Sequence, residues 1–145
     1  MLLRHEDLFH VGIVVDDLQK GMEQYGDSPG LAWRECACPT PDVLTPQGCR
    51  KMRAGAVYSD NGPLHYELIQ RDDDGLWQQV GLHDLGYFTD DLVGDIERLA
   101  EHGFAEEGVM HRDGLPTAAY VTLAGAIRVE LIPRSSCQRL IGREA

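Results

Sequence analysis

The sequence predicts an α+β fold built from two copies of a strand–helix–strand–strand–strand unit. Two observations predict it. The stretch "LFHVGIVVDDL" at 8–18 is echoed by "GLHDLGYFTDDL" at 81–92, and "ELI" at 67–69 occurs again at 130–132. Recurrence at long spacing is typical of a duplicated structural unit. The 145 residues suit a single domain. We expect a first module at 7–70, a second at 82–133 and a C-terminal tail at 134–145.

Each module is expected to open with a strand followed by a helix. "VGIVV" (11–15) and "LGYF" (85–88) are rich in the β-branched and aromatic residues that strands favour. The "DDL" that follows can cap a helix, through Asp16 or Asp17 in the first copy and Asp90 or Asp91 in the second. Apolar residues then recur at helical spacing. They are Leu18, Met22 and Tyr25 in the first copy, and Leu92, Ile96, Leu99 and Ala100 in the second.

Three further strands are expected in each module. In the first they are 31–36, 50–59 and 64–70, and in the second 104–109, 117–123 and 126–132. The first module is the longer one. Its segment "CPTPDVLTPQG" (38–48) contains three prolines and no helical period. This segment is expected to be a loop, either a lid over a site or a plain surface excursion.

Composition excludes several classes of protein. The net charge of −11 would repel nucleic-acid phosphates. No apolar run approaches the ~20 residues of a membrane span, and the first residues do not resemble an export signal. The four cysteines form no C-x-x-C pair, which argues against a zinc ribbon. Since an export signal is not expected, we expect a cytoplasmic protein with reduced cysteine thiols. They are Cys36, Cys38, Cys49 and Cys137.

Four short motifs in order carry a family resemblance: "HVGIVVDDL", "YELI", "LGYFTDDL" and "VELIP". Over roughly residues 7 to 133 the chain resembles the vicinal oxygen chelate superfamily, which includes glyoxalase I, methylmalonyl-CoA epimerase, extradiol dioxygenases and bleomycin resistance proteins. It is most similar to the small epimerase and glyoxalase branch. The resemblance implies a curled mixed sheet around a central cup. It also implies a divalent metal in that cup, held by one residue from the first and last strand of each module.

Strand alternation suggests which side chains face the cup. His10 shares one face with Gly12 and Val14, and the glycine leaves room for a ligand. Val11, Ile13 and Val15 would pack under the helix. In the second copy, Asp84 occupies the place of His10.

His83 would lie on the helix-packing face with Leu85 and Tyr87. Similar proteins often carry "HH" where this chain has His83 and Asp84, with the second His as ligand. A bulge near Gly81 would instead turn His83 inward, which leaves His83 as the alternative to Asp84.

Glu67 and Glu130 stand at equivalent places in the last strands and complete a candidate ligand set with His10 and Asp84. One nitrogen and three carboxylates suit Mn²⁺, Mg²⁺, Fe²⁺ or Co²⁺. Zn²⁺ or Ni²⁺ is favoured if His83 is the ligand. The alternative for the glutamates is a pair of solvated charges on a half-exposed sheet.

By resemblance, the chemistry is that of a metal-dependent lyase, isomerase or epimerase of the glyoxalase type. It would act on a small carbonyl or thioester substrate through an enolate-like intermediate. Glu130 and Glu67 are the candidate catalytic bases. Candidate substrate-binding residues, each of which could instead be core, are Phe88, Tyr120, Trp33 and Met52.

Two other functions remain open on the sequence. A metal-free protein of the resistance type would sequester a small molecule in the cup. A ring-cleaving dioxygenase would need His83 as a second His ligand. Superfamily members commonly form homodimers, so we expect one here, with each cup built within one chain or from two.

Overall fold

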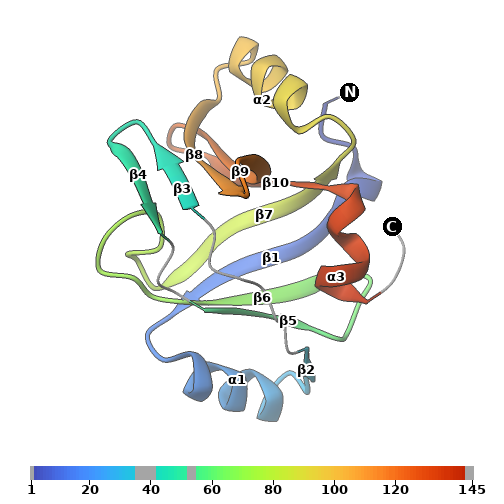
Figure 1. Cartoon of the computed structure of the whole chain (residues 1–145). Helices are drawn as coiled ribbons and strands as arrows, with labels where there is room; N and C mark the ends of the chain where they lie inside the picture. Colours follow the sequence, from blue (N-terminus) through green and yellow to red (C-terminus); the bar gives the residue numbers. More distant parts are fainter. Residues whose placement is uncertain (1, 35–41, 52–54, 143–145) are drawn as a thin grey trace.

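The computed structural model describes residues 2–34, 42–51 and 55–142. Over these residues it contains ten strands in one sheet, three α-helices and two short 3-10 helices (Figure 1). The strands are β1 (Leu8–Val15), β2 (Trp33–Arg34), β3 (Asp42–Thr45), β4 (Gly48–Lys51), β5 (Ala56–Ser59), β6 (His65–Gln70), β7 (Gly81–Thr89), β8 (Ala105–Arg112), β9 (Leu115–Leu123) and β10 (Ile127–Pro133). The helices are η1 (His5–Asp7), α1 (Leu18–Asp27), α2 (Leu92–Glu101), η2 (Arg134–Ser136) and α3 (Cys137–Ile141).

Within these described ranges, each helix is too short or too polar to cross a membrane.

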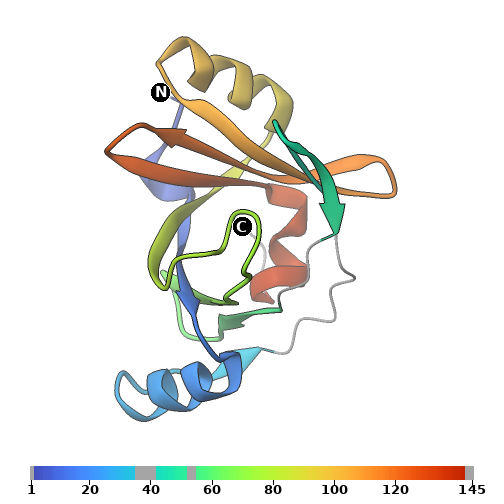
Figure 2. The same cartoon turned by 90° about the vertical axis from the view of Figure 1, so that its left-hand side faces the viewer.

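The two modules meet along their first strands. β1 and β7 run antiparallel at the centre of the sheet, whose order is β2-β5-β6-β1-β7-β10-β9-β8-β3-β4. In each module the first strand pairs in parallel with the last, β1 with β6 and β7 with β10. The sheet curls around a concave side, the cup (Figure 2). The predicted fold class, two βαβββ modules in a curled mixed sheet, is confirmed.

The helices α1 and α2 lie outside the curl, one on each module (Figure 2). Asp17 caps α1 by accepting a hydrogen bond from Lys20 N at 2.9 Å, and Asp91 caps α2 by accepting one from Gly94 N at 3.1 Å. Of each aspartate pair in the two "DDL" motifs, the second is therefore the cap. A Cβ on Gly21 would lie 3.1 Å from Val15 Cγ2, so this glycine lets α1 approach β1 closely.

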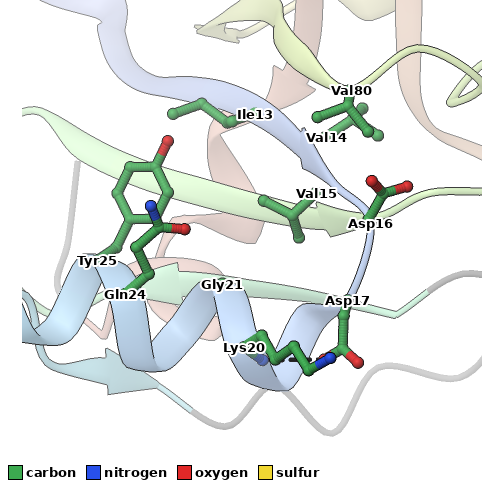
Figure 3. Close-up of a pocket in the computed structure, with 10 residues that line it drawn as sticks. All are labelled: Ile13, Val14, Val15, Asp16, Asp17, Lys20, Gly21, Gln24, Tyr25 and Val80. Carbon is green, nitrogen blue, oxygen red and sulfur yellow. Dashed lines mark hydrogen bonds between the residues drawn. The ribbon is translucent and has the colours of Figure 1, made fainter.

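The outer face of β1 is less buried than alternation predicts. An open pocket of about 290 Å³ lies between β1 and α1. It is lined in part by Ile13, Val15 and Tyr25 (Figure 3). The set Val11, Ile13 and Val15 is only half-buried, whereas the set on the cup side is fully buried. The expectation that the β-branched set would pack under the helix holds only in part, because α1 packs more on β6 than on β1.

The segment 38–48 was predicted to be a loop, and that prediction is wrong for residues 42–48. The strands β3 and β4 form a hairpin here, and β3 pairs with β8 of the second module. The hairpin extends the sheet and gains backbone hydrogen bonds that a surface loop would leave to water. The expected strand at 50–59 is consequently two strands, β4 and β5. Residues 38–41, Cys36 and Met52 lie outside the described residues.

The cup is filled by two segments that follow the two modules (Figure 2). One is the inter-module loop, residues 71–80, whose Trp77 is 1% exposed. The other is α3, formed from the predicted tail, which contributes Cys137, Leu140 and Ile141 to the same buried cluster as Trp77 and Phe9 on β1. Of the described cysteines, Cys49 is an exposed free thiol and Cys137 is buried.

Candidate metal centre

His10 on β1 projects into the cup over a glycine of the neighbouring strand. It is paired with Gly86 on β7, and a Cβ at position 86 would overlap the imidazole ring. The ring is fully buried, and it meets Phe9 and Tyr58 edge-on at centroid distances of 4.5 and 5.3 Å. The residue opposite His10 must therefore be glycine for the ring to occupy this place.

Asp84 on β7 repeats this arrangement with the roles of the two strands exchanged. It is paired with Gly12 on β1, and a Cβ at position 12 would overlap its carboxylate. The sequence suggested that Gly12 would leave room for a ligand. In the structure that room is taken by Asp84.

The two glutamates stand beside the same two glycines. Across the parallel pairs, Glu67 on β6 is level with Gly12 and Glu130 on β10 is level with Gly86. Each glycine thus has one cluster residue on either side. The duplicated motifs place four chemically active side chains around one centre, as the repeat predicted.

These four residues, His10, Glu67, Asp84 and Glu130, form what we call the four-residue cluster. One ligand atom from each lies within 4.8 Å of all the others. From His10 Nε2 the distances are 3.1 Å to Asp84 Oδ2, 3.1 Å to Glu130 Oε2 and 3.2 Å to Glu67 Oε2. The most exposed member is only 6% exposed. Three acidic oxygens therefore converge on one nitrogen away from bulk water.

Hydrogen bonds within the cluster do not satisfy these atoms. One N–H on His10 Nε2 serves one acceptor well, and it faces three. Oε2 of Glu67, Oε2 of Glu130 and Nδ1 of His10 are buried without a hydrogen-bond partner. Buried polar atoms are rarely left so, because each costs free energy.

A divalent ion fits this donor set. Such ions bind oxygen and nitrogen at about 2.0–2.2 Å, which places neighbouring ligands about 3 Å apart. The separations of 3.1–3.2 Å from His10 Nε2 match that spacing. The cluster could therefore hold a divalent metal, and its three carboxylates favour the harder ions Mn²⁺, Mg²⁺, Fe²⁺ and Co²⁺.

Without a metal, the electrostatics of the cluster shift the pKa values of its members in different directions. Burial opposes a charged His10, but the three carboxylates that face its Nε2 prevail and raise the pKa of His10 well above its usual value. Burial likewise opposes a charged Asp84, but hydrogen bonds from His10 and His83 lower the pKa of Asp84 to about 2. Burial and the charge of Glu67 raise the pKa of Glu130 to about 8. Near neutral pH the metal-free cluster thus holds protons on His10 and Glu130.

Comparison with known proteins assigns the family. A profile of the glyoxalase/bleomycin resistance protein/dioxygenase superfamily matches residues 9–120, well over half of the chain. The chain belongs to this superfamily.

Solved structures with the superfamily fold support the same assignment. A hypothetical protein from Bacillus halodurans C-125 is 16% identical, with a TM-score of 0.65 over 90% of this chain and 95% of that one. Methylmalonyl-CoA epimerase from Mycobacterium tuberculosis is 17% identical, with a TM-score of 0.59 over 88% and 87%. A variant of the Streptomyces coelicolor methylmalonyl-CoA epimerase in complex with 2-nitronate-propionyl-CoA is 16% identical, with a TM-score of 0.62 over 92% and 95%. At these identities the likeness concerns the fold. None of the curated proteins matches the chain.

In this superfamily member, His83 does not lie where alternation placed it. The pairing of β7 with β1 is irregular between Gly12 and Ile13, whose partners are Asp84 and Leu82. His83 is the extra residue of this bulge and turns into the cup. There it lies 5.2 Å from the Tyr120 ring, and its Nδ1 lies 2.6 Å from Asp84 Oδ1. Asp84 is thus the member of the cluster, with His83 directly behind it.

The predicted substrate-binding residues are dispersed. Phe88 is buried and stacks on Phe9 at 3.7 Å, and Tyr120 is buried beside Trp77 and His83. Trp33 lies on the edge strand β2 and donates from its indole nitrogen to Met22 O of α1 at 2.9 Å. The structure therefore does not bring Trp33 to the cluster. Met52 is outside the described residues.

Two further aromatic residues lie near the centre, and Tyr58 is one that the sequence did not single out. Tyr58 on β5 is paired with Glu67 on β6, and burial raises the pKa of the Tyr58 hydroxyl well above the usual value. Trp77 reaches the cup from the inter-module loop and donates to Tyr120 Oη at 3.3 Å. Because Tyr58 is the partner of Glu67 in the pairing of β5 with β6, strand pairing could have indicated it from the sequence. Trp77 lies in an irregular segment and carries no such signal.

Proposed function

We propose that this protein is a divalent-metal-dependent enzyme of the glyoxalase type, a lyase, isomerase or epimerase. The observation that carries the proposal is the convergence of three carboxylate oxygens on one buried imidazole nitrogen at 3.1–3.2 Å. A surface cluster of charges would be solvated and dispersed. This one is buried, and it leaves polar atoms without partners that a bound cation would satisfy.

The metal would be held by His10, Glu67, Asp84 and Glu130. When bound, it would supply positive charge to a substrate carbonyl oxygen that becomes negative as a proton leaves the adjacent carbon. His10 and Asp84 contact each other at 3.1 Å, and Asp84 is further held by His83. These two are best suited to a fixed, binding role.

Glu130 and Glu67 are the candidates for proton transfer. In the metal-free protein, burial and neighbouring charge bring the pKa of Glu130 to about 8, so this carboxyl can hold a proton near neutral pH. One glutamate would take the proton from the carbon next to the carbonyl. Return of a proton to the opposite face of that carbon would complete an epimerisation, and delivery to the neighbouring carbon would complete an isomerisation.

The substrate class that we propose is a small carbonyl compound or acyl thioester. Support comes from solved structures of the same fold, one of which is a methylmalonyl-CoA epimerase in complex with methylmalonyl-CoA and NH4+. The present chain is 15% identical to it, so the thioester is a class to test. We also expect a homodimer, which light scattering on the purified protein would test.

Two measurements test the proposal. Metal analysis of purified protein, reconstituted with Mn²⁺ or Co²⁺, should give about one tightly held ion per cluster. In D2O, the loaded protein should incorporate deuterium next to the carbonyl of methylmalonyl-CoA or of a related acyl thioester or α-hydroxy ketone. Absence of bound metal together with absence of exchange across such a panel would contradict the proposal.

A metal-free binding protein is the alternative, and one observation favours it. The raised pKa of His10 makes its ring a resident cation, and the raised pKa of Glu130 keeps that carboxyl neutral. The two protons together reduce the negative charge of the metal-free cluster. Stoichiometric binding of an aromatic compound by metal-free protein, with no metal bound after reconstitution, would support this alternative over the enzyme.

A further inference from the structure

The Asp84 carboxylate is held from both sides. Its Oδ2 lies 3.1 Å from His10 Nε2 and faces the four-residue cluster. Its Oδ1 lies 2.6 Å from His83 Nδ1, and the group rests over Gly12 without room for a Cβ. Oδ2 therefore faces the centre at which a metal ion would bind, and the carboxylate cannot rotate without breaking the contact between Oδ1 and His83.

The bulge in β7 makes this contact available. On a regular strand, the side chains of neighbouring residues point to opposite faces. Here His83 and Asp84 are 7% and 2% exposed, and both lie on the cup side. Arg128 on β10 donates to His83 O at 3.2 Å, which supports the backbone at the irregular position. A one-residue irregularity thus places a second imidazole directly behind the acidic ligand.

The other nitrogen of the same ring holds the inter-module loop. His83 Nε2 lies 2.8 Å from the carbonyl oxygen of Leu76, the residue before Trp77. The loop is closed on itself by a hydrogen bond from Asp72 N to Trp77 O at 2.9 Å, and Asp72 pairs with Arg50 on β4. His83 is thus the link between the loop that fills the cup and the ligand that faces the metal.

We propose that His83 is a positioning residue that orients the Asp84 carboxylate for metal binding and, with its second nitrogen, anchors the inter-module loop to the metal centre. The inference rests on the proposed function, because it takes Asp84 to be a metal ligand. Groups of this kind commonly fix the orientation of a ligand without touching the metal. His83 fits that role because each of its nitrogens faces an acceptor.

The two contacts can be separated with three variants of the full chain. The amide nitrogen of His83→Asn lies near the place of Nδ1, so it keeps a donor for Asp84 and loses the contact to Leu76. The longer His83→Gln places its amide near Nε2 and loses the contact to Asp84. His83→Leu removes both contacts. Co²⁺ titration, followed by the visible absorption of the bound ion, reports on the metal centre, and thermal unfolding of metal-free protein reports on the loop.

We expect His83→Gln and His83→Leu to bind Co²⁺ about 10–100-fold more weakly than the unmodified chain, with His83→Asn restoring most of the affinity. The Co²⁺ spectrum of His83→Asn should match that of the unmodified chain. Unfolding should show the other order, with His83→Gln the most stable of the three variants. A purely structural role would lower affinity and stability together in all three.

Two results would overturn the inference. If the unmodified chain binds Co²⁺ and all three variants bind it equally well, His83 does not position Asp84, although the proposed function stands. If His83→Asn loses as much affinity as His83→Leu, the contact from Nδ1 is not the cause. An unmodified chain that binds no Co²⁺ overturns the proposed function, and the inference with it.

Discussion

The His10 ring lies over Gly86, its partner across the central strand pair, in the space that a Cβ would fill. Asp84 lies in the same way over Gly12, so each first strand supplies one cluster residue and the glycine that accommodates its counterpart. The centre of the cluster therefore depends as much on glycine at positions 12 and 86 as on the acidic side chains.

Gly86→Ala should displace His10 and prevent metal binding. The methyl group would overlap the imidazole in a closely packed interior, so we expect a loss of about 1–3 kcal/mol in unfolding free energy. Urea denaturation and metal analysis check both effects. Gly26→Ala is a suitable control, because its Cβ would lie 3.5 Å from Leu31 O, an ordinary contact. Normal metal content in Gly86→Ala would show that the ring can move without consequence.

Glu130→Gln should abolish proton transfer while leaving a folded protein. The substitution preserves volume and removes the ionisable group, so exchange of deuterium into an identified substrate should fall by about 10²–10⁴-fold. The matched control is Glu97→Gln, an exposed change on α2. Exchange at the unmodified rate in Glu130→Gln would refute its assignment as a base.

Metal binding near pH 7 should release about two protons, one from His10 and one from Glu130. The raised pKa of His10 and the pKa of about 8 for Glu130 keep both protonated in the metal-free protein. Metal affinity should therefore rise with pH up to about 8. Calorimetric titration of Mn²⁺ in buffers of different ionisation enthalpy counts the protons. In Glu130→Gln the count should fall by about one, and an unchanged count would assign the proton to another group.

The metal-free protein should lose stability as the pH rises from about 5 to 8. Glu130 has a higher pKa folded than the ~4.3 of an unfolded chain, so its contribution is lost as the pH rises through that window. His10 adds to the loss above its unfolded pKa of ~6.5. The slope is about 1.4 kcal/mol per pH unit for each proton.

Asp84 acts in the opposite sense. Its pKa is lowered to about 2, so its contribution is present above its unfolded pKa and is lost only as the pH falls below ~4. Urea denaturation in EDTA from pH 5 to 8 measures the net effect. Glu130→Gln should flatten the slope below pH ~6.5. A stability that is level over this range in the unmodified chain would contradict the protonation states assigned to the cluster.

Trp77→Ala should destabilise the protein by about 3–5 kcal/mol, because it removes a large buried side chain from the cup. Trp77 is 1% exposed and packs against Tyr120 with ring centroids 5.9 Å apart. Val80→Ala, on the same loop and 55% exposed, should change stability by less than about 0.5 kcal/mol. Equal effects of the two substitutions on urea denaturation would show that the loop does not pack in the cup in solution.

Three features depend on contacts between residues that are far apart in the chain, and a local sequence pattern does not predict such contacts. Alternation placed His83 behind the sheet, yet a one-residue bulge opposite Gly12 turned it inward. The proline-containing segment was expected to be a loop, yet residues 42–51 include the β3–β4 hairpin, and β3 pairs with the edge of β8. Trp33 was a candidate pocket residue, and its indole nitrogen donates a hydrogen bond to Met22 O of α1. Each outcome depends on a partner that is distant in the chain.

The sequence by itself determined the duplicated fold and that His10, Glu67 and Glu130 would meet, because residues at equivalent places in two paired modules are carried to a common centre by backbone pairing. For the fourth side chain it left Asp84 and His83 as alternatives. Only the tertiary structure decided how these side chains are accommodated and what covers them. Close packing of His10 over Gly86, of Asp84 over Gly12, and of Trp77 and α3 in the cup is a matter of volume in three dimensions. A one-dimensional pattern of polar and apolar residues does not specify that volume.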